Sequence, residues 1–196
     1  MKQTNPVLLV HGFLDTQSVF KAMTRFLENK GWSVHSLNLI PNDGRKPLPE
    51  LAQQVQAYAD EHLGTAPKFD LVGFSMGGLV TRYYLQRLGG NERVERYVSI
   101  SAPNNGTLSA YSLPLPGIRQ MRPQSEFLTD LNGDVESALE KIRVTWMWTP
   151  YDLMILPAHS TRLPIGREVK LAIALHPWML TNQQALNALE EALLEP

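Results

Sequence analysis

The stretch "VGFSMGGLVTRYYL", residues 72–85, places Ser75 between glycines where an apolar strand is expected to become a helix. The apolar run "FDLVGF" leads into it, and helix formers follow it. A serine on so sharp a turn has a strained backbone, which requires small residues two positions before and two after it. Gly73 and Gly77 occupy those positions, so the pattern predicts an exposed nucleophile at a helix N-terminus. The simpler interpretation, a glycine-rich turn with an ordinary N-cap serine, stays open.

Apolar runs with the length of buried strands alternate along the chain with amphipathic segments of helix length. The expected strands are Val7–Val10, Ser33–Leu39, Phe69–Val72, Val94–Ile100, Val144–Trp148 and Glu168–Ala172. Such alternation implies parallel pairing of the strands, with helices on both faces of the sheet. The predicted fold class is therefore α/β: a three-layer α/β/α sandwich around a mostly parallel sheet of about six strands.

The expected helices are defined by apolar residues that recur on one helical face. These sets are Val19, Met23, Phe26 and Leu27, then Leu51, Val55 and Tyr58, then Leu79, Tyr83 and Leu88, and finally Leu186, Leu189 and Leu193. Gly31 and Gly89 follow two of the helices, where a left-handed C-terminal residue is expected. Thr181 and Gln184 have the spacing of a capping box at the start of the last helix.

Length and composition favour one globular domain, residues 1–196, because nothing in the chain marks a boundary. Within it, residues 101–125 contain several prolines and little periodicity, which predicts a loop-rich insertion rather than a helix. Its part from Leu108 to Met121 is expected to cover the substrate. A net charge of −1 with scattered basic residues gives no reason to expect a nucleic acid as partner. The absence of cysteine excludes disulfides, thiol catalysis and thiolate metal sites.

The N-terminal stretch "MKQTNPVLLVHGF" has an apolar run only from Val7 to Val10, too short for the apolar region of a signal peptide. No segment of the chain approaches the roughly 20 apolar residues that cross a bilayer. We therefore expect a cytoplasmic protein, and a monomer, whose contact with any lipid surface is transient.

A second motif ends the first expected strand, in "PVLLVHGFLD". Acyl transfer needs two backbone N–H groups directed at the developing oxyanion, one from the residue after the nucleophile and one from the loop after an early strand. Met76 and Phe13 fit these oxyanion-hole roles, and Gly12 would let the loop approach the nucleophile. His11 is then interpreted as a structural hydrogen-bonding residue, with the role of catalytic base as the alternative.

The motifs "VHGF", "VGFSMGG" and "ISAPNNGT" and the order of strands and helices resemble the α/β-hydrolase superfamily, in particular its small bacterial lipases and esterases. The resemblance covers nearly the whole chain, and its first two motifs are specific to the superfamily. It implies a catalytic triad in the chain order serine, acid, histidine. The residue before the expected histidine, Leu175, departs from the glycine that many relatives have there.

The acid and the histidine must reach Ser75 from the carboxyl edge of the sheet, so both are expected just after late strands. Asp152 follows "RVTWMW", and His176 follows "EVKLAIA". His159 is the competing histidine, and a turn-forming role is the alternative for Asp152. Asp130 and Asp134 lie earlier, around the expected helix "EFLTDLNGD", and are interpreted as helix-end or capping residues.

The predicted function is hydrolysis of carboxylic esters of lipid-like substrates through an acyl-enzyme, with no cofactor and no metal. Acyl-thioester hydrolysis or acyl transfer with the same triad is the alternative, and a non-catalytic binding module or a serine peptidase of this fold is a further one. Reactivity of Ser75 toward a fluorophosphonate would separate an enzyme from a binding module. The apolar residues around the expected site bind the acyl chain or are plain core; they are Phe13, Leu14, Phe74, Leu113, Leu115, Ile118, Met121, Leu153, Ile155, Trp178 and Met179.

Overall fold

A sheet of six parallel strands forms the centre of the computed structural model, which describes residues 5–64 and 68–195. The strands are β1 (Val7–Val10), β2 (Val34–Leu37), β3 (Phe69–Phe74), β4 (Val94–Ile100), β5 (Arg143–Trp148) and β6 (Arg167–Lys170). They are ordered β2-β1-β3-β4-β5-β6, and every neighbouring pair is parallel. All six expected strands are present, and the predicted α/β class is confirmed.

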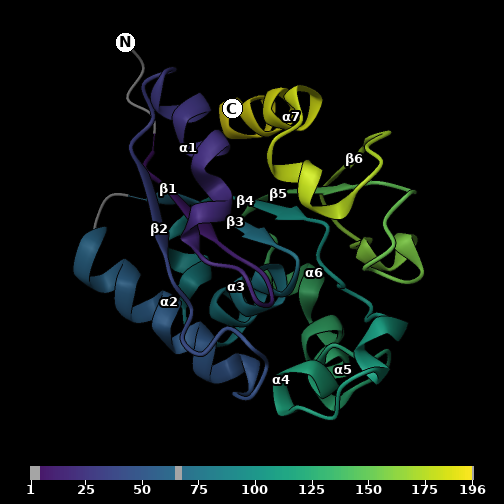
Figure 1. Cartoon of the computed structure of the whole chain (residues 1–196). Coiled ribbons are helices and arrows are strands. Elements are labelled where there is room, and N and C mark those ends of the chain that lie inside the picture. Colours follow the sequence, from purple (N-terminus) through teal and green to yellow (C-terminus); the bar gives the residue numbers. More distant parts are fainter. Residues whose placement is uncertain (1–4, 65–67, 196) are drawn as a thin grey trace.

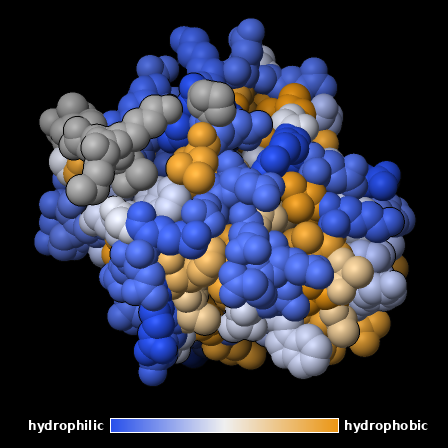
Figure 2. Space-filling model, turned by 90° about the horizontal axis from the view of Figure 1, so that it is seen from above, coloured by the Kyte–Doolittle hydropathy of each residue, from blue (hydrophilic) through white to orange (hydrophobic). Residues whose placement is uncertain are grey.

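Helices cover both faces of the sheet (Figure 1). They are α1 (Lys21–Glu28), α2 (Leu48–His62), α3 (Met76–Arg87), α4 (Pro116–Gln120), α5 (Glu126–Gly133), α6 (Val135–Ala138) and α7 (Gln183–Leu194). One face packs against α1 and α7, and the other against α2, α3, α5 and α6. Figure 2 shows the molecule of Figure 1 from above. This face is mostly hydrophilic, and smaller groups of apolar side chains are scattered over it.

Strand β1 shows how the sequence pattern produces these layers. Because side chains alternate across a strand, Val7 and Leu9 join the apolar cluster under α1 and α7. Leu8 and Val10 join the cluster under α2 and α3. All four side chains are fully buried, as a central parallel strand covered on both faces requires.

Two expectations about local structure need correction. Thr181 and Gln184 do not form a capping box: Asn182 is the N-cap of α7, and its Oδ1 accepts a hydrogen bond from the Gln184 backbone N–H at 2.8 Å. The 101–125 segment also contains the short helix α4, which begins at Pro116 because the first turn of a helix does not need the missing N–H. Gly31 and Gly89 have the expected positive φ, at 93° and 77°.

The strand order places the functional end of the sheet. The chain passes from β1 outward to β2 and then returns to β3 on the other side of β1. In open α/β sheets, ligands bind in the crevice outside the carboxyl ends of the strands at such a reversal. The loop after β1 and the turn after β3, which carries Ser75, meet at this point.

Gly77 is required by the packing of α3 against the end of β1. A Cβ on Gly77 would overlap with the backbone carbonyl oxygens of Val10 and His11. Backbone atoms cannot move aside as the end of a flexible side chain can. Gly133 differs from Gly77, because a Cβ there would meet nothing within 4 Å.

We expect Gly77→Ala to lower the free energy of unfolding by about 2–3 kcal/mol, because the added methyl group overpacks the contact between α3 and β1. Gly133→Ala is the matched control, and its unfolding free energy should stay within about 1 kcal/mol of wild type. Urea unfolding monitored by circular dichroism measures both. Equal stability of the two variants would contradict this account of Gly77.

Candidate active site

Ser75 has the backbone conformation expected of a nucleophile on a strained turn. Its φ is 54° and its ψ is −126°, outside the regions that non-glycine residues normally occupy. Its backbone N–H donates to the carbonyl oxygen of Ile100 at 2.9 Å, which anchors the turn to β4. Ser75 is the N-cap residue of α3, so its side chain lies at the positive end of the helix dipole.

The loop after β1 approaches this serine closely. A Cβ on Gly12 would lie 2.9 Å from the Cβ of Ser75, so only glycine fits here without movement. The next residue is Phe13, the expected oxyanion-hole donor, and Met76 is the first residue of α3. Among the described residues, neither backbone N–H has a hydrogen-bond acceptor. Both therefore remain available to a substrate oxygen.

Asp152 and His176 form a buried hydrogen-bonded pair. The His176 Nδ1 and the Asp152 Oδ2 are 2.6 Å apart, and the side chains are only 3% and 1% exposed. The other carboxylate oxygen of Asp152 accepts from the backbone N–H groups of Met154 and Ile155, both at 2.9 Å. These bonds fix the carboxylate of Asp152. The carboxylate therefore orients the imidazole of His176 without help from the substrate.

The remaining nitrogen of His176 has no partner within the described residues. Its ring packs against that of Phe74, with centroids 4.8 Å apart, and Phe74 directly precedes Ser75. Since Nδ1 is occupied by Asp152, Nε2 is the atom free to exchange a proton. The arrangement brings the loops after β3, β5 and β6 together at one edge of the sheet.

His11 has both ring nitrogens engaged elsewhere. Its Nε2 lies 2.9 Å from the backbone N–H of Leu39, which donates to it, and its Nδ1 lies 2.9 Å from the carbonyl oxygen of Gly12. Burial lowers the pKa of His11, so the neutral form that this bonding needs is favoured. His11 therefore joins the loops after β1 and β2, as the structural interpretation expects.

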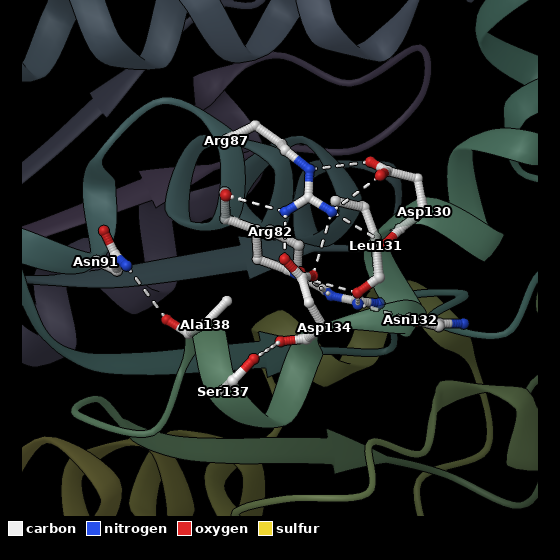
Figure 3. Close-up of polar contacts among 10 residues, drawn as sticks. Arg82, Arg87, Asn91, Asp130, Leu131, Asn132, Asp134, Ser137 and Ala138 are labelled. Atoms are coloured by element: carbon white, nitrogen blue, oxygen red, sulfur yellow. Dashed lines mark hydrogen bonds and ion pairs between the residues drawn. The ribbon is translucent and has the colours of Figure 1, made fainter.

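The other candidate acids and the competing histidine lie away from this pair. His159 is exposed on the 3₁₀ turn Ala158–Thr161, and Asp152 contacts His176 instead. Asp130 and Asp134 form ion pairs with Arg87, at 3.0 and 2.8 Å (Figure 3). Asp134 also stands between α5 and α6, in agreement with the helix-end interpretation.

A buried arginine connects the elements around the site (Figure 3). Arg82 of α3 donates to the carbonyl oxygen of Leu131 and to Asn132 Oδ1, both at 2.9 Å, and more weakly to Asn104. Asn104 in turn donates to the carbonyl oxygen of Thr161 at 2.7 Å. Burial lowers the pKa of Arg82 to about 10. This network holds α3, α5 and the segment after Asp152 together, a role the sequence did not reveal for "ISAPNNGT".

An apolar cavity of about 280 Å³ opens beside Phe13. Its walls are Phe13, Thr107, Ser109, Ala110, Ser112, Leu113, Ile118, Met121, Leu153 and Met154. Five of these were expected to bind substrate: Phe13, Leu113, Ile118, Met121 and Leu153. The hydroxyl of Ser109 donates to the carbonyl oxygen of Met154 at 2.7 Å, which joins the 101–125 segment to the loop that carries Asp152.

The other apolar residues expected to bind substrate lie outside this cavity. Leu14 and Trp178 are 64% and 50% exposed. Phe74 is buried against His176, and Leu115 packs against the core. Ile155 and Met179 are buried as well. Ser109, Ala110 and Ser112 belong to the Leu108–Met121 part that was expected to cover the substrate, although they were not named individually. Thr107 and Met154 were not expected, because a cavity wall made by distant segments leaves no local pattern.

The sequence model of one family, palmitoyl protein thioesterase, matches residues 6–151. The chain belongs to the palmitoyl protein thioesterase family. The matched region contains Ser75 and the loop after β1, and it ends one residue before Asp152. The thioesterase alternative considered for this sequence therefore gains support from family membership.

The curated relatives that this chain resembles include thioesterases. Palmitoyl-protein thioesterase 3 of Dictyostelium discoideum is 28% identical over 124 residues, which are 59% of this chain and 41% of that protein. Lysosomal thioesterase PPT2 of Mus musculus is 32% identical over 107 residues, 52% of this chain and 34% of that protein. The chain thus spans well under half the length of these relatives.

Solved structures with the same fold include lipases. Bacillus licheniformis lipase BlEst2 in its mature form superposes with a TM-score of 0.80 at 15% identity, over 98% of this chain and 93% of that chain. Aspergillus fumigatus lipase B superposes with a TM-score of 0.80 at 19% identity, over 98% of this chain and 53% of that chain. This palmitoyl protein thioesterase family member therefore has the α/β-hydrolase fold, as expected. Over the described residues, no helix is long and apolar enough to cross a membrane, and the cytoplasmic location stays a prediction.

Proposed function

We propose that this chain hydrolyses fatty-acyl esters, with acyl-thioesters as the substrate class that family membership favours. The observation that carries the proposal is the buried pair of Asp152 and His176, 2.6 Å apart, at the edge of the sheet where Ser75 stands on a strained turn. A serine, an imidazole and an orienting carboxylate are the groups that acyl transfer through a covalent intermediate needs.

In the proposed mechanism, His176 Nε2 accepts the hydroxyl proton as Ser75 Oγ attacks the acyl carbon. The backbone N–H groups of Phe13 and Met76 stabilise the oxyanion of the tetrahedral intermediate. The thiol or alcohol leaves with the proton from His176, and the acyl group stays on Ser75. Water then attacks the acyl-enzyme in the same way, which releases the fatty acid and restores the serine. Every group in these steps comes from one chain, so a monomer suffices.

The acyl chain is proposed to occupy the cavity of about 280 Å³ beside Phe13. This volume is close to the lower end of typical ligand pockets, roughly 300 Å³. The lining is mainly apolar, and its few hydroxyl groups are engaged: Thr107 and Ser109 bond to the backbone of Met154. The 101–125 segment supplies most of the wall, which supports its role as a substrate cover.

The first test is turnover of p-nitrophenyl esters and of the matching acyl-thioesters by wild type and by three variants. Ser75→Ala, His176→Ala and Asp152→Asn should each lower kcat at least ~10³-fold, because each removes one member of the proton-transfer chain. His159→Ala is the control and should keep wild-type turnover. An active His176→Ala beside an inactive His159→Ala would overturn the assignment of the base.

A second test narrows the cavity. Leu113→Trp fills part of the proposed acyl site, so kcat/KM for decanoyl relative to acetyl esters should fall at least ~10-fold, while acetyl turnover persists. Leu194→Trp introduces the same side chain at an exposed leucine on α7 and should leave the ratio unchanged. An unchanged ratio in Leu113→Trp would remove the cavity from the proposal.

An apolar rim around the site supports transient contact with lipid aggregates. Of the large apolar side chains that are exposed among the described residues, all except Leu194 lie in segments that follow the carboxyl end of a strand. They are Leu14, Ile40, Leu108, Tyr111, Leu113, Tyr151, Leu153, Met154, Leu156, Leu175 and Trp178. An exposed apolar set of this kind suits a lipid surface.

Trp178→Gln tests the rim without touching the cavity wall. Turnover of emulsified long-chain esters should fall several-fold, because a large apolar contact with the lipid surface is lost. Turnover of soluble butyrate esters should be unaffected. Leu194→Gln, which removes an exposed apolar side chain far from the rim, should change neither rate. An equal loss on both substrates would mean that Trp178 acts on catalysis or folding instead.

A further inference from the structure

A carboxylate that the proposed mechanism does not use lies beside the nucleophile. The position that a Cβ would occupy on Gly12 is 2.9 Å from the Cβ of Ser75 and 3.2 Å from Oδ2 of Asp15. Both side chains therefore border the same point beside the Gly12 backbone. Asp15 is half-buried, so this position is not that of a freely moving surface side chain.

The turn that carries Asp15 is held in place from the loop after β2. Leu14 has a φ of 60°, and its backbone N–H donates to the carbonyl oxygen of Asn42 at 2.8 Å. The side-chain amide of Asn42 donates to the carbonyl oxygen of Asp15 at 2.6 Å. A non-glycine residue in this conformation needs such support, and the support fixes where the carboxylate projects.

The charge of Asp15 is not neutralised by an ion pair within the described residues. Asp43, the neighbouring acid, pairs with Arg45, and Asp152 pairs with His176. Burial raises the pKa of Asp15, and positive charge on His11 or His176 lowers it. Asp15 adjoins the Gly12 position beside Ser75, and the His176 ring packs against Phe74, the residue before Ser75. The carboxylate and the imidazole that must protonate the leaving group therefore both lie near the nucleophile. Asp15 does not line the acyl cavity.

We propose that Asp15 determines leaving-group specificity: its carboxylate favours leaving groups that are cationic or neutral near the scissile bond and disfavours anionic ones. The proposal rests on the hydrolase function proposed above. The physical reason is Coulombic, because a second negative charge held close to Asp15 in a partly desolvated site is repelled, whereas a positive charge is attracted. The acyl side of the site carries no such charge.

Three octanoyl thioesters test this directly. Their thiols are thiocholine, 2-mercaptoethanol and 2-mercaptoethanesulfonate, which share a two-carbon spacer and differ in charge. Released thiol is measured with a chromogenic disulfide, which does not react with this chain because the chain has no cysteine. Each rate is divided by the base-catalysed hydrolysis rate of the same ester, at pH 8, well above the ordinary carboxylate pKa of about 4.

In wild type, kcat/KM for the cationic ester should exceed that for the anionic ester at least ~10-fold, and the ratio should fall with added salt. In Asp15→Asn the ratio should fall to about 2 or less, and in Asp15→Glu a preference for the cation should remain. The ratio cancels any loss common to both esters, such as a disturbed turn. Glu136→Gln removes the same net charge from exposed α6 and should leave the ratio as in wild type.

A wild-type ratio near one, or a ratio unchanged in Asp15→Asn, would overturn the specificity role while the hydrolase function stands. Hydrolysis of the neutral ester that survives in Ser75→Ala would contradict the proposed nucleophile instead. If wild type hydrolyses none of the three esters or their p-nitrophenyl counterparts, both proposals fail together. If Asp15→Asn does not fold, the salt dependence and the Asp15→Glu ratio still decide.

Discussion

The backbone of Ser75 is the constraint on which the rest of this structure depends. A residue with a side chain and a φ of 54° is strained by roughly 1–3 kcal/mol, and such a conformation persists only where its surroundings determine it fully. Here the N–H of Ser75 donates to the carbonyl oxygen of Ile100 of β4, and Gly77 of the helix that follows packs against the backbone at the end of β1. The serine is therefore positioned by three strands at once.

The same packing explains why the loop after β1 must also lack a side chain at Gly12. Because α3 lies directly against the end of β1, the chain leaving β1 passes close to the Cβ of Ser75 at Gly12. This route brings the Phe13 backbone to the position proposed for an oxyanion-hole donor. It also fixes the neutral His11 between two loops, where its ring accepts from Leu39. One steric requirement, a close contact between α3 and β1, thus positions several groups of the site.

Local sequence patterns were sufficient to predict those parts of the structure that depend on neighbouring residues along the chain. The strands, the glycines around Ser75 and the approximate places of Asp152 and His176 follow from apolar runs and from the rule that parallel strands end at one edge. Contacts between distant segments left no such pattern. The wall formed by Ser109 and Met154, and the network from Arg82 through Asn104 to Thr161, depend on pairings across the fold. At the start of α7, both Thr181 and Asn182 are residue types that can cap a helix. The backbone conformation with which the chain enters the helix makes Asn182 the N-cap.

The two sides of the proposed site are built mainly by different elements, which hydrogen bonds and Phe13 connect. The apolar cavity is walled mainly by the 101–125 segment and by the loop after β5, which hydrogen bonds join to each other. Asp15 belongs to the loop after β1, which is held instead by Asn42 from the loop after β2. The two pairs of loops are also joined to each other, because the backbone N–H of Gly117 donates to the carbonyl oxygen of Gly44 in the loop after β2 at 2.9 Å. Phe13 belongs to the loop after β1 and lines the cavity as well. A change in the acyl cavity is therefore transmitted to the loops that hold Asp15, so acyl-chain length and leaving-group charge are coupled around one fixed nucleophile.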